Sequence, residues 1–223
     1  MKTDTVVKAK KPWPTKAAME QIYEAKLWGD NGENFYSGDG SHHPELVQPY
    51  VDRIQSFLKS FENPLTVIDL GCGDFNVGVE LVDYSKKYIA VDIVDDLVKF
   101  NQDKFQHPNL EFYCLDIAKD NLPTADCVVL RQVLQHLSNS EINRIVSKLY
   151  VYQYVVLTEH LPLGDFTPNM DIISGQGTRL KKQSGVNLCE APFQFKPIEL
   201  KQVVSLDVPN HGGKLITTLF QMF

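Results

Sequence analysis

The sequence lacks several features that would assign it to a protein class at once. None of its 223 residues lie in a run of 18 or more apolar residues, which excludes a hydrophobic membrane-spanning helix. The four cysteines form no C-x-x-C pair, so we expect reduced thiols instead of disulfides or a metal site. The first residues lack the continuous apolar segment of a secretory signal. These absences predict a cytoplasmic protein without a membrane partner.

An excess of basic residues is also missing. The formal net charge is -6, which disfavours a nucleic-acid partner because such a partner calls for a basic face. The basic cluster at residues 8–11 precedes Pro12 and Pro14, which oppose helix formation, and we interpret it as a solvated tail. A hydrophobic content of 43% and a charged content of 22% are typical of a globular protein, so we expect one sizeable core.

The most informative stretch is residues 65–74, LTVIDLGCGD. It begins with an aliphatic run typical of a central parallel strand and continues directly into Gly71 and Gly73. Ligands of open α/β sheets bind outside the carboxyl ends of the strands, and glycine allows a close approach to the backbone. The stretch therefore predicts a nucleotide-like cofactor over Gly71, Cys72 and Gly73. The alternative is a tight strand-to-helix turn in another kind of α/β protein.

Two common nucleotide motifs are absent from this stretch. Asn76 replaces the third glycine of the G-x-G-x-x-G pattern, and no Gly-Lys-Ser/Thr follows the strand, which excludes a P-loop. Asp69 would repel a pyrophosphate but suits a ligand with an amino or sulfonium group. The stretch resembles motif I of the class I S-adenosylmethionine-dependent methyltransferases, acid-x-G-x-G-x-G, with Phe75 at the last glycine.

Acidic residues follow the next two predicted strands. Asp92 lies about 20 residues beyond the glycine turn, the spacing at which an acid at a strand tip binds a ribose diol. Dehydrogenases share this feature, so Asp92 supports an adenosine ligand without choosing between NAD and S-adenosylmethionine. Ile93, beside it, is a further candidate for cofactor binding. The resemblance implies that Asp116 contacts the adenine amino group and that Ile117 packs on the ring. The alternative for Asp116 is a turn or helix-capping role.

The resemblance implies an α/β fold: a Rossmann-like, seven-stranded, mostly parallel sheet with helices on both faces and a C-terminal antiparallel β-hairpin. The predicted strands are residues 65–70, 87–92, 110–115, 125–130, 152–158, 200–206 and 214–223. Helices are predicted at residues 16–27, 44–61, 77–84, 95–105 and 138–149. The terminal hairpin favours a methyltransferase over an NAD-linked oxidoreductase.

We divide the chain into two parts. Residues 1–43 would form an N-terminal tail, a helix and a glycine-rich lid, and residues 44–223 the methyltransferase domain, with a substrate-recognition insertion at about 161–197. The turn at residues 37–41 would offer backbone N–H groups to a carboxylate. An ordinary surface loop is the alternative for the lid.

Two histidines are placed for acid–base chemistry. His160 follows the fifth predicted strand and His136 follows the fourth, and an imidazole can accept a proton from a hydroxyl group. A structural role is open for each. Arg131 is a candidate for cofactor binding, and Arg131 and Arg179 are candidates for holding an anionic group, with structural pairing as the alternative. No trio of carboxylates near the strand tips indicates a metal site.

These patterns predict a methyltransferase that uses S-adenosylmethionine. The segment after the fourth strand lacks the [Asp/Asn]-Pro-Pro-aromatic pattern of enzymes that methylate adenine or amide nitrogens. We therefore expect in-line methyl transfer to oxygen of a small polar or sugar-like (glycan-like) acceptor. The alternatives are an NAD-linked oxidoreductase and a catalytically silent S-adenosylmethionine-binding module.

Overall fold

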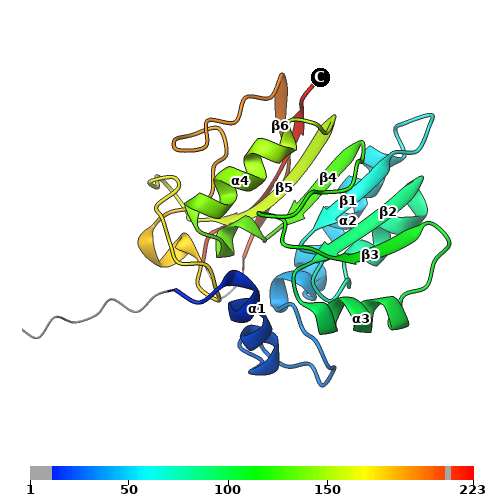
Figure 1. The fold of residues 1–223 in the computed structure, drawn as a ribbon. Coiled ribbons are helices and arrows are strands. Elements are labelled where there is room, and N and C mark those ends of the chain that lie inside the picture. Colours follow the sequence, from blue (N-terminus) through cyan, green and yellow to red (C-terminus); the bar gives the residue numbers. More distant parts are fainter. Residues whose placement is uncertain (1–11, 209–211) are drawn as a thin grey trace, which may run out of the picture.

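A computed structural model describes residues 12–208 and 212–223, so the predicted tail at residues 1–11 and part of the predicted hairpin turn lie outside the described residues. Seven strands form one sheet in the order β3-β2-β1-β4-β5-β7-β6 (Figure 1). The strands are β1 (Thr66–Leu70), β2 (Lys87–Asp92), β3 (Leu110–Cys114), β4 (Cys127–Arg131), β5 (Tyr154–Leu161), β6 (Glu199–Asp207) and β7 (Lys214–Gln221). The first five are parallel, and β7 runs antiparallel to both β5 and β6. The predicted Rossmann-like fold with its terminal hairpin is confirmed.

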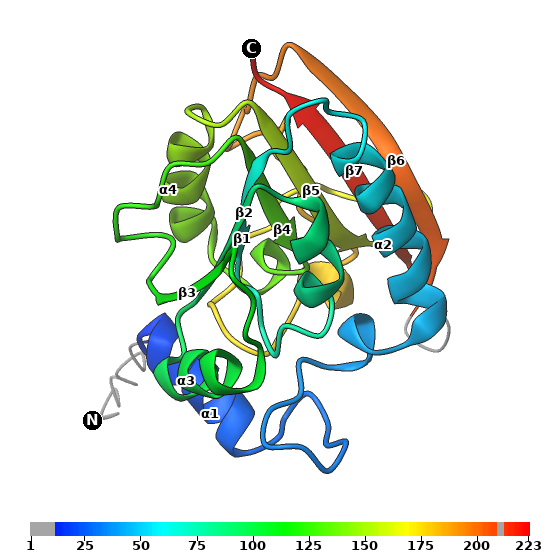
Figure 2. The same cartoon turned by 90° about the vertical axis from the view of Figure 1, so that its right-hand side faces the viewer.

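Helices cover both faces of this sheet. α2 (Pro44–Leu58) lies on one face and α4 (Asn139–Leu149) on the other (Figure 2). The neighbouring residues Val67 and Ile68 explain why both faces need cover: both are fully buried, yet they belong to two different hydrophobic clusters. Successive side chains of a strand point to opposite faces, so the aliphatic run of β1 supplies both cores.

The remaining helices are α1 (Thr15–Glu24), η2 (Gly78–Tyr84) and α3 (Asp95–Lys104), with short 3₁₀ turns η1 (Asp39–Ser41), η3 (Leu134–His136) and η4 (Arg179–Lys182). The predicted crossover helix at residues 77–84 is a 3₁₀ helix instead of an α-helix. Its first residue, Gly78, lies under the Phe75 ring, where an added Cβ would come within 2.4 Å of Phe75 Cε2. This tight packing leaves little room for a wider helical turn. The predicted capping box of Ser138 and Glu141 is present at the start of α4.

Arg179 anchors the segment predicted as an insertion. Its side chain is 1% exposed and donates hydrogen bonds to the backbone oxygens of Leu134, Gln135, Leu137 and Met170, and to Asn139 Oδ1. The structural alternative for Arg179 therefore holds. Three of these acceptors, on Leu134, Gln135 and Leu137, lie in the turn that follows β4, so the guanidinium ties the loop of residues 161–197 to that turn.

Helices long and apolar enough to cross a membrane do not occur in residues 12–208 and 212–223.

Candidate functional site

A cavity of about 600 Å³ lies along the carboxyl ends of the parallel strands. Its walls come from the glycine turn after β1, the tips of β2, β4 and β5, helix α1, residues 37–43 and residues 176–181. Ligand pockets in proteins typically measure roughly 300–1,000 Å³, so this cavity is large enough for a nucleotide-sized ligand. Every residue predicted to bind a cofactor or to act as a base lines it: Asp69, Gly71, Cys72, Gly73, Asp92, Ile93, Asp116, Ile117, Arg131, His136 and His160. Their individual roles stay predictions.

The glycine turn has the backbone that its sequence implies. Gly71 and Gly73 have φ values of 83° and 57°, a region that favours glycine. An added Cβ would lie 2.6 Å from Val133 Cγ2 at Gly71 and 2.4 Å from Ser37 Oγ at Gly73. Both the backbone and the packing of neighbouring loops therefore require glycine here. Neighbouring side chains thus fill the positions that a Cβ would take, while both glycines still line the cavity.

Phe75 explains how the chain tolerates the loss of the last motif glycine. Its φ is 62°, so this residue adopts the left-handed backbone that glycine would adopt. The ring is fully buried and packs edge-on against Tyr88, Phe105 and Phe112. The residue type departs from the motif, but the backbone of the turn does not.

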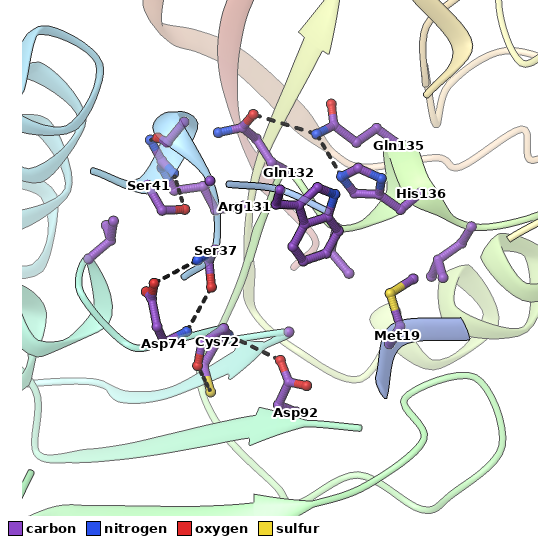
Figure 3. Close-up of a pocket in the computed structure, with 18 of the residues that line it drawn as sticks. Met19, Ser37, Ser41, Cys72, Asp74, Asp92, Arg131, Gln132, Gln135 and His136 are labelled. Atoms are coloured by element: carbon purple, nitrogen blue, oxygen red, sulfur yellow. Dashed lines mark hydrogen bonds between the residues drawn. The ribbon is translucent and has the colours of Figure 1, made fainter. Parts of the chain in front are cut away.

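Asp92 lies buried at the tip of β2. Its Oδ2 accepts a hydrogen bond of 3.1 Å from the N–H of Gly73 (Figure 3), and its Oδ1 accepts one of 3.1 Å from the N–H of Val94. Burial raises the pKa of this carboxyl group, and the two N–H groups partly offset that effect. Each oxygen retains a lone pair, so the group can accept further hydrogen bonds from a ligand in the cavity.

Asp69 and Arg131 form the deep wall of the cavity. Burial raises the pKa of Asp69 to about 7, although its Oδ2 accepts a hydrogen bond of 3.0 Å from the hydroxyl of Tyr88. Arg131 Nη2 donates to the backbone oxygen of Gly40 at 2.7 Å, while its Nε is buried with no acceptor among the described residues. A buried donor without a partner costs free energy, so this atom favours a ligand acceptor nearby.

Asp116 takes part in a turn as well as lining the cavity. Its Oδ1 accepts a hydrogen bond of 3.0 Å from the N–H of Ala118, and its Oδ2 pairs with Lys119 Nζ at 2.6 Å. These contacts fit the turn alternative for its carboxylate. Ile117 beside it is buried and belongs to the same hydrophobic cluster as Tyr23 of α1.

The two predicted bases lie in different surroundings. His136 packs against Trp28, with ring centroids 5.1 Å apart, and burial lowers its pKa to about 4. His160 is half-buried at the end of β5, and its Nε2 lies 2.5 Å from the backbone oxygen of Gly212. A carbonyl oxygen accepts only, so this contact places the hydrogen on Nε2 and the lone pair on Nδ1.

The segment predicted as a lid is packed against the glycine turn. Ser37 N–H donates to Asp74 Oδ2 at 2.7 Å, Asp74 N–H donates to Ser37 Oγ at 2.8 Å (Figure 3), and His42 Nε2 lies 2.6 Å from Asp74 Oδ2. The N–H of Ser37, which we expected to face a ligand carboxylate, is thus already bonded to Asp74. Tyr23 of α1 joins this network through a 3.0 Å contact with Ser37 Oγ.

Sequence reasoning missed two glutamines beside the histidines. Gln132, directly after β4, has a φ of 59°, which is unusual for a residue with a side chain. Gln135 Nε2 lies 3.5 Å from Gln132 Oε1 and 3.2 Å from His136 Nε2 (Figure 3). Gln135 Oε1 also accepts a hydrogen bond of 3.3 Å from the N–H of His160. No sequence motif marks these glutamines. The signal that could have identified them is their position directly after the tip of β4.

Within the described ranges, no group of three or more His, Cys, Asp and Glu side chains is placed to hold a metal ion.

Comparison with known proteins agrees with this geometry. The family model described as "Methyltransferase domain" matches residues 67–152, which run from β1 to just before β5. Residues 67–152 thus resemble a methyltransferase domain. The N-methyltransferase NodS of Bradyrhizobium japonicum, solved with S-adenosyl-L-homocysteine, has the same fold, with a TM-score of 0.65 at 11% identity over 92% of this chain and 98% of that one. The magnesium protoporphyrin IX methyltransferase of Synechocystis has a TM-score of 0.59 at 17% identity, over 96% and 100% of the two chains.

Curated relatives match part of the chain. An uncharacterized RNA methyltransferase of Chlamydia trachomatis is 31% identical over 122 residues, which is 49% of this chain and 30% of that protein. Phosphoethanolamine N-methyltransferase 3 of Arabidopsis thaliana is 28% identical over 43% of this chain and 20% of its own length. The chain thus spans less than a third of the length of these relatives.

Proposed function

We propose that this methyltransferase domain transfers a methyl group from S-adenosylmethionine to an oxygen atom of a small polar or sugar-like acceptor. One observation carries the proposal. A single cavity joins the glycine turn and Asp92 at one side to His160 and the glutamine pair at the other. Such a cavity can hold a methyl donor and a polar acceptor together, which is the main requirement of an in-line displacement.

The residues of the β1–β3 side fit this cofactor. The lone pairs of Asp92 suit a ribose diol, and Ile93 and Ile117 offer apolar surface for the adenine ring. Asp69 suits the amino group of the methionine part, while Arg131 Nε suits its carboxylate. When bound, S-adenosylmethionine supplies a methyl group activated by its sulfonium. We retain Asp116 as a contact for the adenine amino group, secondary to its turn role.

The residues of the β4–β5 side support transfer to oxygen. A hydroxyl acceptor must lose its proton, and we assign that proton to Nδ1 of His160, because the contact with Gly212 places hydrogen on Nε2. His136 is the weaker candidate, since a pKa of about 4 makes it a poor base near neutral pH. We assign His136 a packing role against Trp28, which also lines the cavity.

The two alternatives have less support. The antiparallel β7 between β5 and β6 is the hairpin that we expect of a methyltransferase and not of an NAD-linked oxidoreductase. A silent cofactor-binding module would not need the polar side chains of Gln132, Gln135 and His160 in the same cavity. The match to RNA methyltransferases leaves RNA as an acceptor to be included in any test.

Calorimetric titration of the purified protein with S-adenosylhomocysteine, and separately with NAD, tests the cofactor. We expect binding of the first and none of the second; binding of NAD alone would overturn the proposal. Transfer of labelled methyl groups from S-adenosylmethionine then tests the acceptor, with separate panels of small hydroxyl compounds, small amines and RNA transcripts. Label in the hydroxyl panel supports the proposal, and label in the RNA panel alone would contradict its acceptor class.

A further inference from the structure

Charged side chains are distributed unevenly along the cavity. Four of its six acids lie at or just beyond the strands of the β1–β3 side, and the cations and imidazoles named below lie on β4, on β5 and on the loops beyond them. The acids on the first side are Asp69, Asp74, Asp92 and Asp116, and the cations and imidazoles on the second are Arg131, His136, His160 and Lys181. Because the strand order is β3-β2-β1-β4-β5, these four acids lie on one side of the cavity and these four basic residues lie on the other.

Three further titratable residues line the cavity, and one of them, Glu141, is an acid that follows β4. Asp39 in the lid accepts a hydrogen bond of 2.5 Å from the Tyr36 hydroxyl at the protein surface. Glu141 at the start of α4 is bonded to the hydroxyls of Ser138, Thr15 and Ser174. His43 precedes α2 and is exposed. Both acids are thus bonded to hydroxyl groups, and neither forms an ion pair with Lys181 among the described residues.

We propose that the acceptor carries an anionic group, either a carboxylate or a phosphate, and that Lys181 binds this group at the mouth of the cavity. This inference rests on the proposed function, because it names the chemical class of the acceptor. It assigns the two cations to two different anions: Arg131 to the carboxylate of the cofactor, and Lys181 to the acceptor.

The position of Lys181 is set by the best-anchored part of the insertion. Lys181 lies in η4, two residues after Arg179, whose guanidinium is buried and bonded to five acceptors. The adjacent Lys182 is engaged, since its Nζ donates to the backbone oxygen of Asp171 at 2.9 Å. A short helix anchored in this way holds Lys181 at the cavity, where the residue is exposed.

Lys181 has no charge partner among the described residues. Among residues 12–208 and 212–223 it forms no ion pair, whereas Lys26, Lys87, Lys99, Lys104, Lys119 and Lys214 each pair with a carboxylate. An exposed cation beside a cavity and away from carboxylates attracts anionic ligands and favours their retention. A neutral acceptor would gain at most a hydrogen bond from this ammonium group, without the attraction between opposite charges.

Direct binding of simple anions tests the inference without knowledge of the acceptor. The protein is first titrated with S-adenosylhomocysteine, and the saturated complex is then titrated with benzoate, phenyl phosphate and the neutral analogue benzamide. We expect the Lys181→Gln variant to bind the two anions about tenfold more weakly, as for loss of a charge-assisted contact, with benzamide binding unchanged. Lys181→Arg should retain anion binding. The control is Lys196→Gln, an exposed lysine of the same insertion that does not line the cavity.

The possible outcomes separate this inference from the proposed function. If S-adenosylhomocysteine does not bind, the proposed function fails and the inference fails with it. If it binds but neither anion does, or if Lys181→Gln binds the anions like the parent protein, the inference is overturned while the methyltransferase proposal stands. Preference for benzoate or for phenyl phosphate then identifies which anionic group the site favours.

Discussion

The two sides of the cavity are built in different ways. On the β1–β3 side, the contacts come from backbone turns and from buried carboxyl groups directly at strand tips, as at Gly73 and Asp92. On the β4–β5 side, the lining side chains come from loops far apart in the sequence, among them Gln132, His160 and Lys181. The first side is therefore fixed by the fold, whereas the second can change with its loops while the fold stays the same.

Substitution of Phe75 tests how strongly the fold fixes the β1–β3 side. Of the substitutions proposed, we expect this one to have the largest effect. Phe75→Ala should lower the free energy of unfolding by about 3–5 kcal/mol, because a fully buried ring is lost. Phe75→Gly should be no less stable than Phe75→Ala, since glycine tolerates a φ of 62°. Urea unfolding measures both, with the exposed Phe223→Ala as control. A glycine variant clearly less stable than the alanine variant would show that the backbone of this turn carries no strain.

Substitution of His160 tests whether the second side carries the chemistry. His160→Gln should lower kcat by about a hundredfold, the range typical of a lost general base, with unchanged affinity for S-adenosylhomocysteine. His107→Gln is the matched control, because His107 lies at the surface and pairs with Asp83. Steady-state kinetics with labelled methyl donor measures the effect. A kcat equal to that of the parent protein would remove His160 from the proton transfer.

Substitution of Asp92 should affect the first side alone. Asp92→Asn should weaken the binding of S-adenosylhomocysteine by about 1.5–3 kcal/mol, because a charge-assisted hydrogen bond to the ribose is lost. Asp96→Asn on the exposed face of α3 serves as control. Calorimetry at one pH measures both variants. Unchanged affinity in Asp92→Asn would show that the buried carboxyl group acts only on its own loop.

The smallest expected effect is the pH dependence of stability at His136. Burial lowers the pKa of His136 to about 4, while an unfolded histidine titrates near 6.5, so the unfolded state binds more protons between these values. The free energy of unfolding should therefore fall as the pH drops from about 6.5 to 4. In His136→Gln, which lacks this histidine, the decrease over the same pH range should be smaller by on the order of 1–2 kcal/mol. Burial raises the pKa of Asp69 and Glu159, so these two groups make the free energy of unfolding rise as the pH drops. They do so equally in the parent protein and in His136→Gln. Urea unfolding across this pH range measures the difference, and identical slopes would contradict the burial of His136.

Much of the fold followed from local patterns. The aliphatic run of residues 65–70 predicted a strand buried on both faces, and the Ser138–Glu141 pair predicted the start of α4, because both signals lie within a few residues of the structure that they specify. The placement of Asp92 beside Gly73 followed from the rule that parallel strand tips meet at one edge.

The missed features depend on contacts between distant residues. Phe75 adopts a left-handed backbone because its ring has a place between Tyr88 and Phe112, which the local sequence does not reveal. Ser37 reaches Asp74 across 37 positions of the chain. The anchoring role of Arg179 depends on carbonyl groups of the turn after β4. Every residue has a backbone carbonyl group, so the sequence does not indicate which of them accept hydrogen bonds from Arg179.

The position of β7 has a consequence for the order in which the chain can fold during synthesis. Among the described strands β6 pairs with β7 alone, whereas β7 also pairs with β5, over eight residues. The ribosome makes β6 first, yet β6 cannot join the sheet until β7 has emerged and added itself to the open edge of β5. Until then a partly made sheet presents an unpaired strand edge, the kind of surface on which nascent chains associate with one another.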